Sequence, residues 1–250
     1  MPYRKRTRNL YDPSSKEPFA LSRSRIDRFL ECPRCFYLDR RLGFDRPSMP
    51  GFSLNNAVDA LLKKEFDILR EKGHSHDLMK EYAVDLIPLK HEDLPIWRDD
   101  VYKYVGASVI HKPTNLKIQG IVDDTWVDQS DMFYMVDYKS TSTTQEISLE
   151  DEYKKGYKRQ VEVYQWIFRQ MGHTVSDIAY FVFANASKEP ESFNKKLEFE
   201  ISIVSHEGGD SWVEPTIFKI KECLDSDEIP DIATDCEYCG YTGSVNSVNQ

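Results

Sequence analysis

Two aspartates and a lysine near the middle of the chain have the spacing of a site for metal-assisted chemistry. Asp123 and Asp137 lie on two strand-like segments joined by a short turn centred on Ser130. That register places the two carboxylates opposite each other, because directly paired residues share one face of a sheet. Lys139, two residues further along, lies on the same face. Two facing carboxylates repel unless a cation lies between them, so the pair predicts an oxygen site for Mg²⁺ or Mn²⁺.

The apolar residues around Asp137 strengthen the prediction of a metal site. The segment 133–138 is otherwise apolar, and an unpaired carboxylate there would be costly. The ammonium of Lys139 could orient a metal-bound water or stabilise charge on a phosphate. An Asp–Lys ion pair at the rim of a sheet, without any chemistry, is the alternative interpretation.

Four of the five cysteines form two CxxC pairs near opposite ends of the sequence. They are Cys32, Cys35, Cys236 and Cys239, and Cys223 is left over. In a chain that shows no export signal, such pairs indicate a metal or redox element before disulfides. A structural zinc site and a [4Fe–4S] cluster both fit four thiolates, whereas four unliganded buried thiols are the alternative.

The composition favours a globular protein. Of 250 residues, 40% are hydrophobic and 12% aromatic, which excludes disorder, and no apolar run approaches the roughly 20 residues of a membrane span. We therefore expect a cytoplasmic protein without a membrane partner. The net charge is -9, yet residues 1–46 carry twelve basic and six acidic side chains. A basic end on an acidic body can hold a polyanion, or can be a solvated arm.

Apolar periodicity predicts the elements that position these residues. We expect helices near 22–32, 54–73, 149–171 and 210–224, and strands at 105–111, 116–128, 132–140, 178–184 and 196–204. Residues 74–104 are expected to form a short helix, an extended stretch and a second short helix. The order predicts an α/β (α+β) fold with a mixed central β-sheet flanked by helices. A flexible basic arm (1–20), a single domain (21–242) and a polar tail (243–250) complete the expected organisation.

Four short motifs, in this order, resemble the PD-(D/E)XK nuclease superfamily, and its RecB-type branch most closely. They are a helix opening at 21–36, a G-x-x-D segment at 120–123, a D-x-K segment at 137–139 and a Q-x-x-x-Y segment at 160–164. The branch includes nuclease domains of bacterial recombination enzymes and of CRISPR-associated adaptation nucleases. The resemblance implies a restriction-endonuclease-like fold whose termini are joined by the four-cysteine metal site. Relatives favour an iron–sulfur cluster there, whereas the two-plus-two spacing favours zinc.

The resemblance also implies an activity, that of a Mg²⁺- or Mn²⁺-dependent DNA nuclease acting in repair, recombination or defence. The branch usually carries a histidine ligand on the second helix; here Asn55 or Asp59 would stand in its place. Tyr164 could equally be a core aromatic. The residues implied for catalysis are Asp123, Asp137, Lys139, Gln160 and Tyr164, with Asp123 and Asp137 as ligands of the ion.

The implied partner is DNA, and basic side chains near the motifs are the candidate phosphate contacts. Loss of the histidine motivates an alternative, a catalytically silent DNA-binding or scaffold module derived from a nuclease. A cysteine-metal protein that acts with protein partners only is a third possibility. The candidate contacts are Arg23, Arg25, Lys154, Lys155, Lys158 and Arg159, with Arg28, Arg34 and the arm residues Arg4, Lys5, Arg6 and Arg8.

Overall fold

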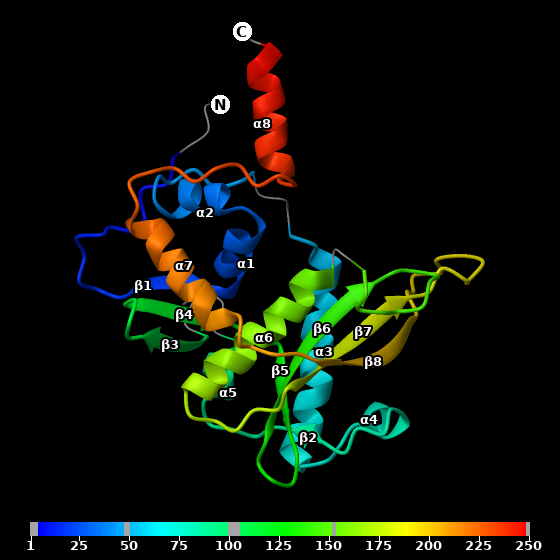
Figure 1. Cartoon of the computed structure of the whole chain (residues 1–250). Helices are drawn as coiled ribbons and strands as arrows, with labels where there is room; N and C mark the ends of the chain where they lie inside the picture. The colour runs from blue at the N-terminus through cyan, green and yellow to red at the C-terminus, as the bar shows by residue number, and fades with distance from the viewer. Residues whose placement is uncertain (1–4, 48–50, 100–105, 152–153, 249–250) are drawn as a thin grey trace. The chain divides into compact units, whose positions relative to one another are not determined.

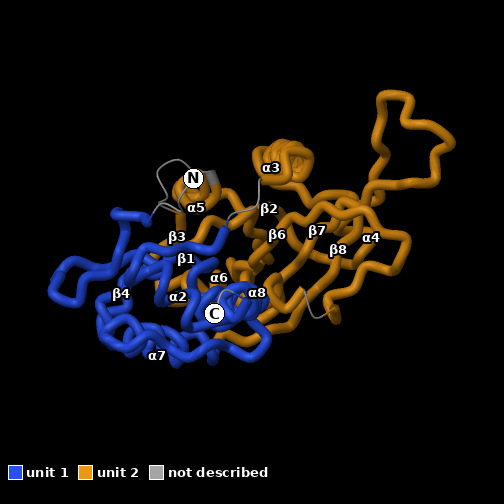
Figure 2. The backbone as a smooth tube through the Cα atoms, turned by 90° about the horizontal axis from the view of Figure 1, so that it is seen from above, with its two compact units in different colours: residues 1–50, 109–119, 211–250 blue, residues 51–108, 120–210 orange. Residues whose placement is uncertain are grey.

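The computed structural model describes residues 5–47, 51–99, 106–151 and 154–248 (Figure 1). The chain divides into two compact units, which are coloured separately in Figure 2. Unit 1 comprises residues 1–50, 109–119 and 211–250, and unit 2 comprises residues 51–108 and 120–210. The single domain over residues 21–242 stays a prediction. Within the described residues, no helix is long and apolar enough to cross a membrane.

Unit 2 is built on a five-stranded mixed sheet in the order β2-β5-β6-β7-β8. Strands β6 and β7 are parallel, and the other neighbours are antiparallel. A mixed sheet flanked by helices confirms the predicted fold class. The strands are β2 (Ile87–Pro88), β5 (Asp124–Val127), β6 (Phe133–Thr141), β7 (Ile178–Ala186) and β8 (Phe199–Glu207).

Helices α3 (Ser53–Lys72) and α6 (Lys155–Gln170) lie on opposite faces of this sheet (Figure 1). Phe66 of α3 packs in one core cluster with Trp126 and Tyr138. Because side chains alternate along a strand, Asp137 points to the other face, towards α6. The short helices α4 (Asp77–Glu81) and α5 (Leu94–Asp99) flank β2, which confirms the helix–extended–helix order predicted for residues 74–104.

Unit 1 gathers the two ends of the chain around a three-stranded sheet, β1-β4-β3. The hydroxyl of Tyr37 donates to the Ser226 carbonyl at 3.0 Å, and the Arg41 guanidinium donates to the Leu224 carbonyl at 3.0 Å. These bonds hold the early helices against the end of α7. The elements are β1 (Phe19–Ser22), α1 (Arg23–Glu31), α2 (Pro33–Arg40), β3 (Ala107–His111), β4 (Leu116–Gly120), α7 (Val213–Asp225) and α8 (Glu237–Val248).

The single strand predicted over residues 116–128 is wrong. It breaks into β4 and β5, which belong to different sheets. At the break, the Ile121 carbonyl accepts a bond from the Tyr164 hydroxyl, and the Asp123 carboxylate accepts one from the backbone N–H of Tyr138. Residues 121–123 therefore bond to Tyr164 and Tyr138, close to the residues of the predicted metal site.

Two helices were not expected. Pro33 was predicted only to end the first helix, but it also begins α2, because proline suits the first position of a helix. The residues predicted as a polar tail continue α8 as far as Val248.

Helix α6 begins at Lys155 rather than near residue 149, and β8 lies three residues later than predicted. Arg4, Tyr153, Val105 and residues 249–250 lie outside the described residues.

Candidate functional site

The hairpin between β5 and β6 has the register predicted from the sequence. Asp124 pairs with Val136, and Val127 pairs with Phe133, so the turn is centred on Ser130. The Asp128 carboxylate stabilises this turn by accepting bonds from the backbone N–H groups of Ser130 and Met132, at 2.8 and 3.0 Å. Position 123, which immediately precedes β5, therefore lies opposite position 137.

Asp137 is fully buried and lies at the centre of the site. Its Oδ1 accepts a hydrogen bond from Gln160 Nε2 at 2.7 Å. Its Oδ2 forms an ion pair with the ammonium of Lys139 but has no hydrogen bond of good geometry. The Lys139 ammonium therefore occupies one side of this oxygen, and a carboxylate oxygen has a second lone pair to offer a ligand. A hard oxygen donor in this position fits Mg²⁺ or Mn²⁺.

A third carboxylate comes from α3. Lys63 Nζ lies 3.0 Å from Asp59 Oδ2 and 3.7 Å from Asp123 Oδ1, so it links the helix to the hairpin. Asn55, one turn earlier, is exposed. Of the two positions predicted to replace the histidine, the structure brings Asp59 to the site. Lys63 was not predicted, although its spacing of four residues from Asp59 was a usable signal.

The electrostatics agree with a site for a cation. Burial raises the pKa of Asp137 to about 7; the Lys139 ammonium opposes this rise, and the nearby Asp123 adds to it. Burial and the charge of Asp123 also raise the pKa of Asp59. Burial alone would lower the pKa of Lys139, but the carboxylates of Asp137 and Asp123 outweigh it and raise that pKa. In the described part of the site, the carboxylates of Asp59, Asp123 and Asp137 face the two ammonium groups of Lys63 and Lys139.

Gln160 and Tyr164 of α6 both contact residues of the candidate site. The Tyr164 hydroxyl donates to the Ile121 carbonyl at 2.7 Å and accepts from Gln160 Nε2 at 3.2 Å. Gln160 Oε1 lies 3.5 Å from Lys139 Nζ. The two side chains thus fix Asp137, Lys139 and the break after β4 relative to one another.

Gly120 is required by the position of Tyr164. A Cβ at residue 120 would lie 2.4 Å from Tyr164 Cε1. We expect Gly120→Ala to lower the free energy of unfolding by about 1–3 kcal/mol, because overpacking displaces the ring. Gly209→Ala, where a Cβ meets nothing within 4 Å, is the matched control. Urea denaturation of both variants checks this, and equal stability of the two would contradict it.

The cations predicted on α6 differ in accessibility. Lys154 is buried, and its ammonium donates to a backbone carbonyl at 2.6 Å. Lys158 pairs with Glu150 at 2.9 Å, Arg159 is half-buried, and Lys155 is exposed. Their contact with DNA stays a prediction.

The predicted cations of α1 are ion-paired. Arg23 lies 4.0 Å from Asp27, and Arg25 lies 2.8 Å from the buried Asp39. Contact of these two arginines with DNA also stays a prediction.

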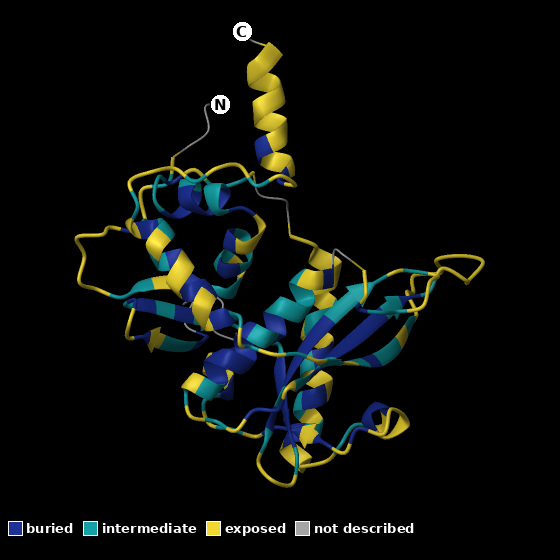
Figure 3. Ribbon diagram, viewed as in Figure 1, coloured by how far each residue is buried: buried dark blue, intermediate teal, exposed yellow. Residues whose placement is uncertain are grey.

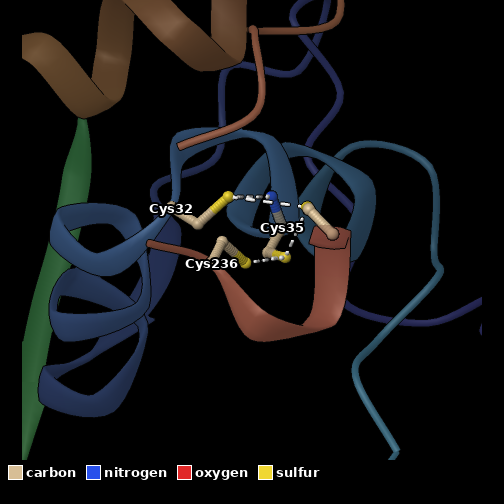
Figure 4. Close-up of side chains that lie close together, drawn as sticks. Cys32, Cys35 and Cys236 are labelled. Carbon is tan, nitrogen blue, oxygen red and sulfur yellow. Dashed lines mark hydrogen bonds between the residues drawn. The ribbon is translucent and has the colours of Figure 1, made fainter. Parts of the chain in front are cut away.

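The four cysteines of the CxxC pairs come together in unit 1. Figure 4 labels three of them, Cys32, Cys35 and Cys236. All are buried, and their sulfur atoms lie within 4.8 Å of one another. Three of the sulfur–sulfur distances are 3.6–3.8 Å. A tetrahedral zinc ion with Zn–S bonds of about 2.3 Å separates its sulfurs by about 3.8 Å. The cluster therefore has the size of a single-ion site. Cys223, on α7, is not part of it.

The sequence profile of the PD-(D/E)XK nuclease superfamily matches residues 20–244. The chain belongs to this superfamily. No curated protein matches it. Among solved structures, it is similar to the chain titled "Crystal structure of SSO0001", with 12% identity, 92% of this chain and 86% of that chain covered, and a TM-score of 0.35. A likeness this weak has no bearing on the function.

Within this PD-(D/E)XK nuclease superfamily member, the residues of three of the four motifs lie in one place. The loop before β5, strand β6 and helix α6 contribute Asp123, Asp137 with Lys139, and Gln160 with Tyr164. Membership in the RecB-type branch stays a prediction.

Proposed function

We propose that this protein is a metal-dependent deoxyribonuclease that hydrolyses the phosphodiester bonds of DNA. The observation that carries the proposal is the acidic cluster of Asp59, Asp123 and Asp137, which lies against the ammonium groups of Lys63 and Lys139. Superfamily membership supports nuclease chemistry. The RecB-type assignment and a role in repair, recombination or defence belong to the same proposal and rest on the motif resemblance. The cytoplasmic location is proposed with them.

Each residue has a distinct role in this proposal. Asp123 and Asp137 would hold Mg²⁺ or Mn²⁺, with Asp59 as a further ligand from α3. When bound, the ion supplies an activated water and neutralises phosphate charge. The Lys139 ammonium, held against Asp137, would stabilise charge that develops on the scissile phosphate. Gln160 positions both groups through its amide.

The test is cleavage of DNA by the purified chain, dialysed and then supplied with Mn²⁺ or Mg²⁺. We expect cleavage only with added ion. Asp59→Ala should raise the ion concentration for half-maximal cleavage about tenfold or more, because a charged ligand is lost. Asn55→Ala, one turn away on the exposed part of α3, should leave that concentration unchanged. Cleavage that needs no added ion would contradict the proposal.

The second candidate function is DNA binding without catalysis. It is favoured by the exposed Asn55 at the position where the RecB-type branch usually carries a histidine ligand. Retention of DNA without cleavage in both Mg²⁺ and Mn²⁺ would support this alternative over the first.

We further propose that the four cysteines hold one tetrahedral ion, such as Zn²⁺. The sulfur spacing of 3.6–3.8 Å supports this. A [4Fe–4S] cluster places four iron atoms among its thiolates and needs wider spacing. Such an ion would stabilise unit 1 by linking α2 to the start of α8.

A further inference from the structure

Lys63 is a second ammonium at the acidic cluster, beside Lys139. It lies on α3, a helix with a buried face and an exposed face (Figure 3). Its side chain is 17% exposed, and its Nζ lies 3.0 Å from Asp59 Oδ2 and 3.7 Å from Asp123 Oδ1. An i,i+4 pair with Asp59 alone would be an ordinary interaction on a helix surface. The approach to Asp123 is different, because it reaches from the helix to the loop before β5.

The charge of the cluster comes from five described side chains. Asp59, Asp123 and Asp137 contribute three negative charges, and Lys63 and Lys139 contribute two positive charges. The cluster therefore carries one negative charge in excess. A single divalent ion reverses that excess to one positive charge, whereas two ions would leave three, which mutual repulsion opposes. The presence of Lys63 thus favours one ion over two.

The ion pairs that continue along α3 are balanced among themselves. Asp67 pairs with Arg98 at 2.7 Å and also with Arg70, and Arg70 pairs in turn with the buried Asp124. Two carboxylates therefore face two guanidinium groups. In the part of the chain that the structure describes, this network adds no net charge to the acidic cluster, so the excess there is decided by the cluster's own groups.

We propose that the Lys63 ammonium takes the place of a second divalent ion, so that the acidic cluster binds one Mg²⁺ or Mn²⁺. In two-ion sites the ions lie about 3.5–4 Å apart and share the charge of the reacting phosphate. Lys63 would supply the second positive charge from α3, and its contact with Asp123 holds the ammonium beside the ligands of the first ion. The inference rests on the proposed function, since it fixes the number of ions at the same site.

The test counts the ions that bind in the absence of DNA, so it does not depend on catalysis. The full chain is titrated with Mn²⁺ and followed by electron paramagnetic resonance, with the cysteine cluster left as purified because thiolates select softer metals. We expect wild type to bind one Mn²⁺ and Lys63→Met to bind two, since methionine keeps the apolar stem and removes the charge. Lys63→Arg keeps the charge and should bind one. Lys64→Met, at the exposed neighbouring position, is the matched control and should also bind one.

The dependence of cleavage on Mn²⁺ gives a second measurement. Below saturation, the cleavage rate of wild type should rise with the first power of the Mn²⁺ concentration, because one ion completes the site. The rate of Lys63→Met should rise with the second power, because its second positive charge must come from solution. Lys64→Met should behave as wild type does.

The outcomes separate this inference from the proposed function. Two ions bound by wild type, or one ion bound by Lys63→Met, would overturn the inference and leave Lys63 as a link between α3 and the hairpin. Should circular dichroism show that Lys63→Met is unfolded, Lys63→Gln keeps a polar end without the charge and should bind two ions instead. A wild type that binds one ion and cleaves no DNA contradicts the proposed function alone. If wild type binds no Mn²⁺, both fail.

Discussion

Lys139→Ala is expected to reduce DNA cleavage by about 10²- to 10³-fold at saturating Mn²⁺, which is the cost of removing one group that stabilises transition-state charge. The ammonium of Lys139 is ion-paired with Asp137 and packs 4.5 Å from the centre of the Tyr157 ring, so it is held at the site. The 2.7 Å hydrogen bond that Asp137 accepts from Gln160 does not involve Lys139. We therefore expect the fold to survive.

The matched control is Lys90→Ala. Lys90 is exposed and pairs with the exposed Glu71 at 2.7 Å, so its loss should leave cleavage unchanged. Single-turnover rates report the chemical step, and circular dichroism reports the fold. Full activity of Lys139→Ala would remove this residue from the mechanism, whereas an equal loss from Lys90→Ala would point to a general effect of charge.

Cys239→Ala is expected to abolish metal binding at the cysteine cluster and to lower the thermal midpoint by about 10 °C or more. Structural zinc contributes about 10–16 kcal/mol to the folding free energy of zinc-finger peptides. In a chain of 250 residues, the loss of even a fraction of that free energy would lower the thermal midpoint by this amount. The sulfur of Cys239 lies 3.6 Å from that of Cys35 and 3.8 Å from that of Cys32, so this one substitution removes one of the four ligands.

Cys223→Ala is the control for this experiment, because Cys223 is half-buried on α7 and lies outside the cluster. It should keep the metal and shift the midpoint by only a few degrees. Elemental analysis identifies the ion; a colourless protein with zinc agrees with the sulfur spacing, and a brown protein with iron contradicts it. Unchanged stability after loss of the metal would remove its structural role.

The hairpin was predictable because its information is local. The turn that includes Ser130, with Asp128 before it, sets the register, and the register alone brings Asp123 opposite Asp137. The break after Gly120 was not predictable in the same way. The groups that bond the backbone at the break are distant in sequence: the Tyr164 hydroxyl donates to the Ile121 carbonyl, and the Val122 N–H donates to the Trp97 carbonyl.

The cysteine cluster was predictable from residue type, since two CxxC pairs indicate one site without any knowledge of the fold. Helix α8 was not, because its sequence of glycine, serine, valine and asparagine has weak helix propensity. Its first turn carries Cys239, whose side chain belongs to the cluster. Lys63 was missed for a similar reason, since its contact with Asp123 exists only once α3 packs beside the hairpin.

The segmented make-up of unit 1 has a consequence for biosynthesis. Cys35 and Cys236 are 201 positions apart, and unit 1 draws on three separate stretches of the chain. A nascent polypeptide leaving the ribosome therefore exposes one thiol pair long before the other is translated. The cell must keep that first pair reduced meanwhile, and an ion can be captured by all four sulfurs only after translation has passed residue 239.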